Sequence, residues 1–259
     1  MNYRQVTSIY FSPTESTKRV VELIAEELPC AHESLDLTET AKFRPDYTFR
    51  EDEVVLVGVP VYAGRIPATS IERFKKLHGR QTPVVLVVVY GNRAYDDALL
   101  ELKNVMIEQG FRPVAGIAAV AEHNIARCVA SGRPDAQDQA QLKKFGQEVA
   151  ARLAAVKCNY EIPELAVSGN YPYKDPGSLP IKIKVSSACS GCGRCIRSCP
   201  VQAISRTDAK VTDESRCIHC MRCVLVCPKD ARKLGTMMQF AVNQKMKKAC
   251  AGRKEPELF

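Results

Sequence analysis

The sequence lacks several signals that would assign it to common functional classes. Its longest uninterrupted apolar run, Val84–Tyr90, has 7 residues, far fewer than the ~18 that a membrane-spanning helix needs. The N-terminal stretch has no basic segment followed by a long apolar one, so we expect no secretory signal, no membrane partner and a cytoplasmic location. The pattern G-x-G-x-x-G is absent, which argues against a nicotinamide dinucleotide site of the Rossmann kind. No aromatic or helix-in-groove motif accompanies the basic residues, and we therefore expect no nucleic-acid partner.

Length and charge divide the chain into two unequal parts. With 259 residues it is long enough for one large or two modest domains. Residues 1–155 carry 19 Lys and Arg against 20 Asp and Glu, a net charge of −1. Residues 156–259 carry 18 against 9, a net charge of +9. The whole positive surplus therefore lies in the C-terminal part.

Apolar runs of strand length alternate with helical patterns over the first part. Four runs rich in β-branched residues predict strands buried on both faces, and a fifth candidate is weaker. Between them, apolar residues recur at the three-to-four spacing of amphipathic helices. This alternation predicts right-handed crossovers and a doubly wound, five-stranded parallel sheet of the α/β class. The four runs are Val6–Phe11, Val54–Val59, Thr82–Tyr90 and Val114–Val120, and the weaker candidate is Ser34–Leu37.

The rest of the chain divides by composition. Residues 157–186 hold four prolines and little periodicity, which predicts a linker draped over the surface after a first domain of residues 1–156. A cysteine-rich domain is expected over residues 187–234. Residues 235–259 form a basic tail with a helical pattern, for which a docking role and a plain solvated face are both open.

Cysteine is concentrated in one short window. Of 12 cysteines, 8 lie in the 39 residues from Cys189 to Cys227. They form two C-x2-C-x2-C-x3-C-P motifs, 28 residues apart. In such a pair, three cysteines of one motif and the last cysteine of the other hold each [4Fe–4S] cluster. The expected ligands are Cys189, Cys192, Cys195 and Cys227 for one cluster, and Cys217, Cys220, Cys223 and Cys199 for the other.

Other interpretations of this window are weaker. Disulfides are unusual in a cytosolic chain, and zinc needs four ligands but no doubled set with proline after each. His219 lies inside the second motif, where we expect it to fill space because the thiolates are complete. Four further cysteines show no pairing pattern and are expected to be plain thiols: Cys30, Cys128, Cys158 and Cys250. Six basic residues lie near the motifs, and three roles are open for them: to offset the negative charge of the clusters, to bind an acidic partner, or only to aid solubility. They are Arg194, Arg197, Arg216, Arg222, Lys182 and Lys184.

A hydroxyl-rich turn follows the first predicted strand and opens a helix. Its hydroxyls and free backbone N–H groups would make an anion site, although any helix cap looks partly like one. Two other loops reach the same edge of the sheet, where open α/β sheets bind ligands. Each of them offers glycine for close approach and tyrosine for stacking on a flat ring. The turn holds Ser12, Thr14, Glu15, Ser16 and Thr17; the loops hold Pro60, Val61, Tyr62, Ala63, Gly64 and Arg65, and Tyr90, Gly91, Asn92, Arg93 and Tyr95.

With these segments the whole chain resembles the flavodoxin–ferredoxin fusion proteins of anaerobic bacteria. The resemblance is carried by YFSPTEST, GVPVYAGRIP, YGNRAYDDAL, AEHNIARCVASGRPD, GNYPYK and the doubled cysteine motif. It implies a flavodoxin-like domain that binds FMN, followed by a small α+β ferredoxin domain with two [4Fe–4S] clusters. Glu15 departs from the family, because flavodoxins commonly have glycine there and a carboxylate beside a phosphate is repulsive unless it points to solvent. The resemblance implies that Ser12, Thr14, Ser16 and Thr17 hold the phosphate, while Tyr62, Ala63, Gly64 and Arg65 flank one side of the flavin and Gly91, Asn92, Arg93 and Tyr95 the other.

The implied function is electron transfer between clusters that move single electrons and a flavin that holds two. An acidic redox protein is the expected partner, and a second copy of the chain stays open. Two alternatives remain: a reductase whose small organic substrate stacks on the flavin, and an FMN-free module that docks a ferredoxin to another protein. His123 follows the last predicted strand, where it either delivers a proton or serves as a hydrogen-bonded loop histidine.

Overall fold

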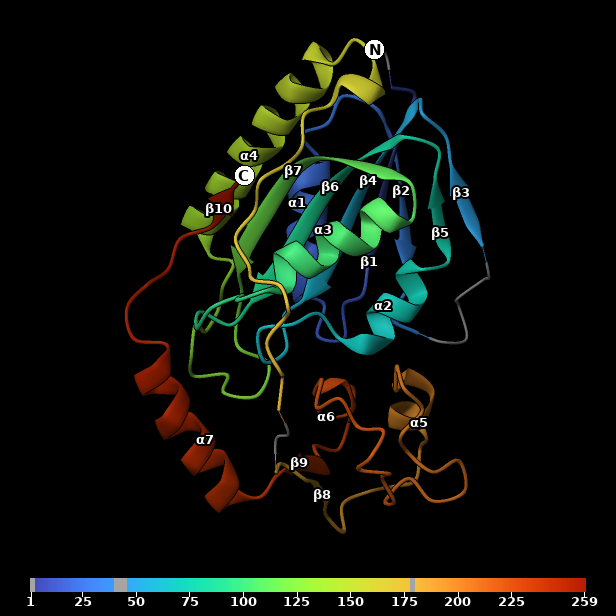
Figure 1. The fold of residues 1–259 in the computed structure, drawn as a ribbon. Helices are drawn as coiled ribbons and strands as arrows, with labels where there is room; N and C mark the ends of the chain where they lie inside the picture. Colours follow the sequence, from blue (N-terminus) through green and yellow to red (C-terminus); the bar gives the residue numbers. More distant parts are fainter. Residues whose placement is uncertain (1–2, 40–45, 178–179) are drawn as a thin grey trace.

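A six-stranded sheet organises the N-terminal part of the computed structural model, which describes residues 3–39, 46–177 and 180–259 (Figure 1). Five strands run parallel. In space they follow the order 2-1-3-4-5, which is the flavodoxin-like order of doubly wound sheets. The predicted fold class is therefore confirmed. The parallel strands are β1 (Gln5–Tyr10), β2 (Ala31–Asp36), β4 (Glu53–Pro60), β6 (Thr82–Tyr90) and β7 (Phe111–Val120).

Helices cover both faces of this sheet, as right-handed crossovers require. On one face α1 (Ser16–Ala25) and α4 (Ala136–Ala155) enclose one apolar core. On the other, α2 (Ala68–Phe74) and α3 (Ala98–Glu108) enclose a second. The middle strands are buried on both sides, which explains why their sequences are unbroken apolar runs. At Gly58 a Cβ would lie 2.3 Å from Cγ2 of Val21, so only glycine lets α1 approach β4 this closely.

Three short strands were not predicted. β10 (Glu257–Leu258) pairs antiparallel with β7, so the sheet has one more strand than the five expected. β3 (Tyr47–Phe49) and β5 (Leu77–Gly79) form a separate parallel pair. Two or three residues are too few to show a period of two, and β10 follows a polar segment. The C-terminal tail is therefore part of the N-terminal sheet.

The linker lies along α3. It begins at the short helix η2 (Asn159–Glu161). The carboxylate of Asp97 accepts hydrogen bonds from the backbone N–H groups of Asn170 (2.8 Å) and Lys174 (2.7 Å). Residues 178–179 of the predicted linker lie outside the described residues.

The cysteine-rich part lies beyond the carboxyl ends of the parallel strands (Figure 1). It contains α5 (Arg194–Ser198), α6 (Arg222–Leu225) and an antiparallel pair of β8 (Ile183–Val185) and β9 (Arg232–Leu234). α7 (Thr236–Ala249) follows β9, and the chain then returns to the sheet at β10. Among the described helices, none combines the length and apolarity that crossing a membrane would take.

Candidate metal centres and cofactor site

Four of the predicted ligands line one small cavity in the cysteine-rich part. Cys189, Cys192 and Cys195 come from the segment that enters α5, and Cys227 comes from the turn after α6. Cys192 is exposed, whereas Cys195 is buried. The structure therefore brings three cysteines of the first motif together with the last cysteine of the second.

The other four cysteines also lie together. Burial raises the pKa values of Cys217, Cys220 and Cys223, that of Cys220 to about 12 and that of Cys223 to about 11. The charge of Cys199 adds to the rise at all three, and Cys199 packs in the same apolar cluster as Cys223, so it lies beside the second motif. Within the described residues, no three His, Cys, Asp or Glu side chains converge on a single metal ion.

A buried guanidinium adjoins both cysteine groups. Arg232 lines the cavity of the first group, and its charge opposes the rise that burial causes in the pKa of Cys223 in the second. Its Nη2 donates hydrogen bonds to Ala209 O (2.8 Å) and Thr212 Oγ1 (3.1 Å). Its Nε is buried and has no hydrogen-bond partner in the described part of the chain. A buried cation that faces no carboxylate is costly, and a negatively charged cluster on either side would offset that cost. The residues present therefore fit two clusters.

Replacing this cation gives a first prediction. Arg232→Met keeps most of the side-chain volume and removes the positive charge. Because a nearby cation favours the reduced, more negative cluster, we expect at least one midpoint potential to fall by about 60 mV, a tenfold change in the one-electron equilibrium. A redox titration followed by electron paramagnetic resonance measures the shift. Lys210→Met, an exposed lysine of the same domain, is the control and should shift neither potential by more than a small fraction of this.

A cavity of about 400 Å³ lies between the sheet edge, the second cysteine motif and α7. Its volume falls in the usual range for small-molecule cofactors, about 300–1,000 Å³. The loops after β4, β6 and β7 form one wall, the second motif another, and α7 the third. The main lining residues are Tyr62, Gly64, Tyr90, Gly91, Arg93, His123, Ile218, His219, Met238, Val242 and Lys245.

The second cysteine group directly adjoins this cavity. Ile218 and His219, which line it, stand between Cys217 and Cys220 in the chain. Burial raises the pKa of the Tyr62 phenol well above its usual value, and the nearby Cys220 raises it further. Tyr62 therefore lies between the cavity and this cysteine group. His219 Nε2 is 2.8 Å from Ile181 O, a contact that joins the second motif to the segment before β8.

A second cavity, of about 600 Å³, adjoins the first. The two share Asn124 and Ile125 as lining residues. Thr14 and Ser16 of the hydroxyl-rich turn line the second cavity, and their hydroxyl oxygens are 3.3 Å apart. Arg127 and Lys233 supply positive charge there, while two acidic residues also line the cavity: Asp230, and Glu122, which pairs with Arg127. Hydroxyl donors and cations together suit an anion such as phosphate.

The other residues of this turn lie outside the two cavities. Ser12 and Thr17 are buried and line neither cavity. The Ser12 N–H donates to Thr38 Oγ1 (2.7 Å), and Ser12 Oγ accepts from Lys18 N–H (3.0 Å), so this side chain shapes the turn. Glu15 adopts φ 65°, the left-handed conformation that glycine favours. Its carboxylate is 2.9 Å from Nη1 of Arg222 on α6, so it is engaged by the cysteine-rich part.

Three residues expected to flank the ring use their side chains to hold other segments. Arg65 donates to Glu101 at 2.8 and 2.5 Å, and Tyr95 OH donates to Glu257 at 3.0 Å. The Asn92 amide donates to the carbonyls of residues 250 and 252 in the tail, at 2.9 and 2.8 Å. None of the three lines either cavity, and Pro60 does not either. Sequence analysis missed these roles because the partners lie up to 162 positions away.

His123 is half-buried at the cavity wall. Its Nδ1 accepts hydrogen bonds from the backbone N–H groups of Ile125 (3.2 Å) and Ala126 (3.1 Å), and burial lowers its pKa. The imidazole is therefore neutral with its proton on Nε2. A Cβ on Gly91 would lie 2.7 Å from Cδ2 of His123, so glycine is needed at that position.

Comparison with known proteins separates the two parts. Residues 188–231 match the family model of the 4Fe-4S dicluster domain. No curated protein matches the chain. Several solved structures resemble the N-terminal part. A flavodoxin from Streptococcus pneumonia TIGR4 is 15% identical over 57% of this chain and 99% of its own, with a TM-score of 0.39. A flavodoxin from Fusobacterium nucleatum, bound to flavin mononucleotide, is 12% identical over 58% of this chain and 97% of its own, with a TM-score of 0.38. A flavodoxin from the domain Archaea is 13% identical over 58% of this chain and 99% of its own, with a TM-score of 0.39.

The family match and the cysteine geometry agree on the C-terminal part, a dicluster domain for two [4Fe–4S] clusters. The strand order defines the N-terminal part independently of any comparison. The chain is thus an iron–sulfur protein in which a doubly wound domain of flavodoxin-like topology is joined to a domain of the 4Fe-4S dicluster family.

Proposed function

We propose that this chain is an electron-transfer flavoprotein in which FMN lies across the two adjoining cavities, next to the second cluster. The observation that carries the proposal is the shared wall: the segment between Cys217 and Cys220 lines the same cavity as the loops after β4 and β6. A cofactor in that cavity would lie beside the second set of thiolates. The clusters supply single electrons, and FMN accepts two electrons and two protons.

The chain's own residues divide the binding task. Thr14 and Ser16 would hydrogen-bond the phosphate in the second cavity, with Arg127 and Lys233 offsetting its charge. Tyr62 and Tyr90 supply aromatic surface in the first cavity. The Nε2–H of His123 would donate a hydrogen bond to the ring.

The arrangement favours one order of transfer. Cys192 of the first group is exposed, whereas Cys220 of the second is buried beside the cavity. We propose that an acidic one-electron donor reduces the first cluster, and that the second cluster passes each electron on to the flavin. With thiolates in the ligand role, a reducing compartment is needed, and we propose the cytoplasm.

A reductase acting on a small organic substrate is the second candidate. It would need space beside the flavin, and α7 lines that side of the cavity through Met238, Val242 and Lys245. The position of α7 favours an electron carrier over a reductase, because the helix would screen the flavin ring from small molecules and leave the wall next to the second cluster unchanged.

The composition of protein purified without oxygen tests the proposal. We expect about eight iron atoms, eight sulfides and one FMN per chain, with a visible spectrum of both cofactors. Zinc in place of iron would contradict the clusters. Iron without FMN, even after incubation with micromolar FMN, would favour the FMN-free docking module.

The Glu15–Arg222 pair gives a further prediction. Arg222 also contacts Glu39 (3.0 Å) and Pro13 O (3.0 Å), and its side chain is only 10% exposed. In Arg222→Ala the Glu15 carboxylate loses its cation and faces the phosphate turn, so we expect FMN to bind about tenfold more weakly. Fluorescence titration of apoprotein with FMN measures the change.

The double variant Arg222→Ala/Glu15→Gln separates charge from packing. This variant lacks the guanidinium and also the repulsive carboxylate. Its affinity for FMN should therefore recover most of what Arg222→Ala loses. Equal affinity in the single and double variants would mean that the loss arises from the altered contact between the two domains.

A further inference from the structure

α7 exposes large apolar side chains. Met237 is 88% exposed, Phe240 is 65% exposed and Met238 is 37% exposed. No residue of this 14-residue helix is buried. Such a group of neighbouring exposed apolar residues, unlike isolated ones, marks an interaction surface.

The same helix carries charge of one sign. Its sequence contains Lys245, Lys247 and Lys248 and no acidic residue. Lys184 of β8 adds a further cation at the start of the helix, where its Nζ would lie 3.2 Å from a Cβ on Gly235. We call Met237, Met238, Phe240, Lys245, Lys247 and Lys248 together the α7 face. Exposed apolar side chains at the start of the helix and lysines toward its end together complement an acidic protein surface.

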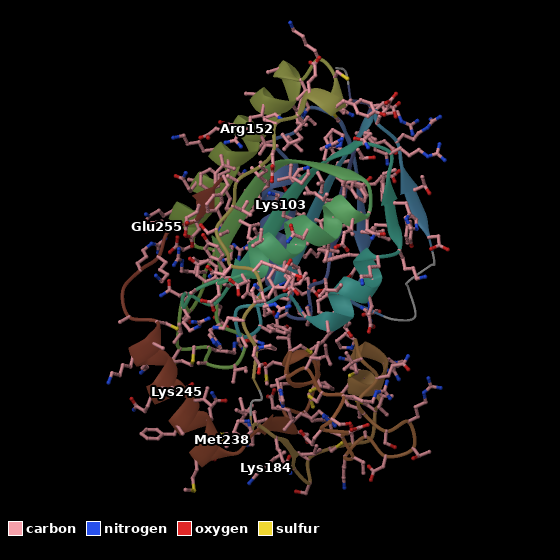
Figure 2. All side chains as sticks on the ribbon, in the orientation of Figure 1. Lys103, Arg152, Lys184, Met238, Lys245 and Glu255 are labelled. Atoms are coloured by element: carbon pink, nitrogen blue, oxygen red, sulfur yellow. The ribbon has the colours of Figure 1, made fainter. Side chains whose placement is uncertain are left out.

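The α7 face adjoins the first cavity, because the helix that carries it also lines this cavity. Met238 and Lys245 belong to this exposed helix and also line the cavity (Figure 2). The Gln239 side-chain amide donates to Ile125 O (3.0 Å) in the loop that separates the two cavities. A protein docked on the α7 face would therefore bring its own redox centre close to whatever the cavity holds.

We propose that the α7 face docks an acidic redox protein that exchanges single electrons with the flavin, as a second port distinct from the exposed first cluster. The inference rests on the proposed function, because it needs FMN in the first cavity. With FMN bound, two docking events would move two electrons from the reduced flavin to two ferric centres of the partner, each of which would become ferrous, and the two protons of the reduced flavin would leave to solvent. Met and Phe are enriched in the cores of protein interfaces, which suits this occupant.

An anionic membrane is the other occupant that lysines attract. Helices that lie in a membrane interface carry an apolar face along their length. On α7 the large exposed apolar side chains are confined to Met237–Phe240 at one end, and the inner side of the helix lines the cofactor cavity. The proposal therefore commits to a protein.

Two variants test it in the full, cofactor-loaded chain. Lys247→Glu/Lys248→Glu reverses the charge, and Met237→Gln/Phe240→Ser removes the apolar patch; none of these residues lines a cavity. Lys143→Glu/Lys144→Glu on α4 is the matched control. Stopped-flow reoxidation of the reduced protein by oxidised rubredoxin, a small acidic ferric protein, gives the second-order rate constant.

At about 10 mM salt we expect the charge reversal to lower that rate constant at least tenfold, and at about 1 M salt the difference should vanish. The apolar variant should react slowly with rubredoxin at both salt concentrations, and the α4 control should react as fast as the unaltered protein. With basic cytochrome c as the oxidant, the charge reversal should not lower the rate constant. Equal rubredoxin rates in all four proteins would overturn the proposal. It would also be overturned if the reversal abolished binding to phosphatidylserine vesicles while leaving the rubredoxin rates unchanged.

FMN content and cluster-driven flavin reduction, measured first in each protein, separate the two hypotheses. A chain without FMN contradicts the proposed function and, with it, the port. A chain with normal FMN content and normal internal reduction, but with rubredoxin rates indifferent to the α7 variants, contradicts the port alone.

Discussion

Loss of the second cluster is expected to slow reduction of the flavin at least 100-fold. In Cys223→Ser the cluster beside the cavity cannot form, so FMN must take electrons from an external donor by collision. A linked donor acts at an effective concentration in the millimolar range, so at about 10 μM external donor the step slows about 100-fold. Rapid mixing with reduced ferredoxin, followed at the flavin absorbance, measures it.

The position of the altered cysteine makes the test specific. Cys199→Ser lies in the first motif but beside the second cysteine group, and it should behave like Cys223→Ser. Cys192→Ser should remove the first cluster and leave the second able to reduce the flavin. Iron analysis of each variant, with a loss of about four atoms, shows which clusters are present. Flavin reduction at the normal rate in Cys223→Ser would leave the clusters only a structural or partner-binding role. Cys158→Ser, outside both cysteine groups and outside both cavities, is the control.

The cysteine sites could be anticipated from sequence because their constraint is local. Three ligands fall within seven consecutive residues, and the fourth is supplied by the partner motif at a fixed spacing. The same holds for the sheet, since strands buried on both faces must be unbroken apolar runs. Arg232 shows the limit of this reasoning. Nothing in its sequence context distinguishes it from the exposed basic residues, and only the packing of β9 against the cysteine loops buries it.

Sequence patterns predicted only one wall of the cavity that we propose for FMN. The loops after β4 and β6 were expected there, and Tyr62, Ala63, Gly64 and Gly91 do line it. The walls made by the second motif and by α7 depend on how the C-terminal part folds back, which no periodicity encodes. Asn92 illustrates the consequence. It was expected at the flavin because of its loop, yet its side chain is satisfied by the tail.

Asn92 also provides the means to test whether the tail holds α7 over the cavity. Its amide is 5% exposed and donates to two tail carbonyls, while its Oδ1 accepts from Lys254 N–H (3.1 Å) and Arg133 (3.3 Å). In Asn92→Ala these buried groups lose their partners, at about 1–3 kcal/mol. Since Asn92 has φ 63°, alanine adds about 1 kcal/mol of backbone strain. We expect the free energy of unfolding to fall by about 3 kcal/mol in total.

The loss of these hydrogen bonds should also speed the release of FMN, because the segment after Ala249 connects α7 to the sheet and so holds the helix over the cavity. We expect the dissociation rate, followed by trapping free FMN with excess apoflavodoxin, to rise at least tenfold, the equivalent of about 1.4 kcal/mol. Asn92→Gly is the matched control, since glycine accepts the left-handed backbone but makes none of the four hydrogen bonds. It should release FMN as fast as Asn92→Ala while losing less stability. If Asn92→Gly instead kept FMN as tightly as the unaltered protein, the tail would not be what holds α7 over the cofactor, and the helix would owe its position to its own contacts, such as that of Gln239 with Ile125.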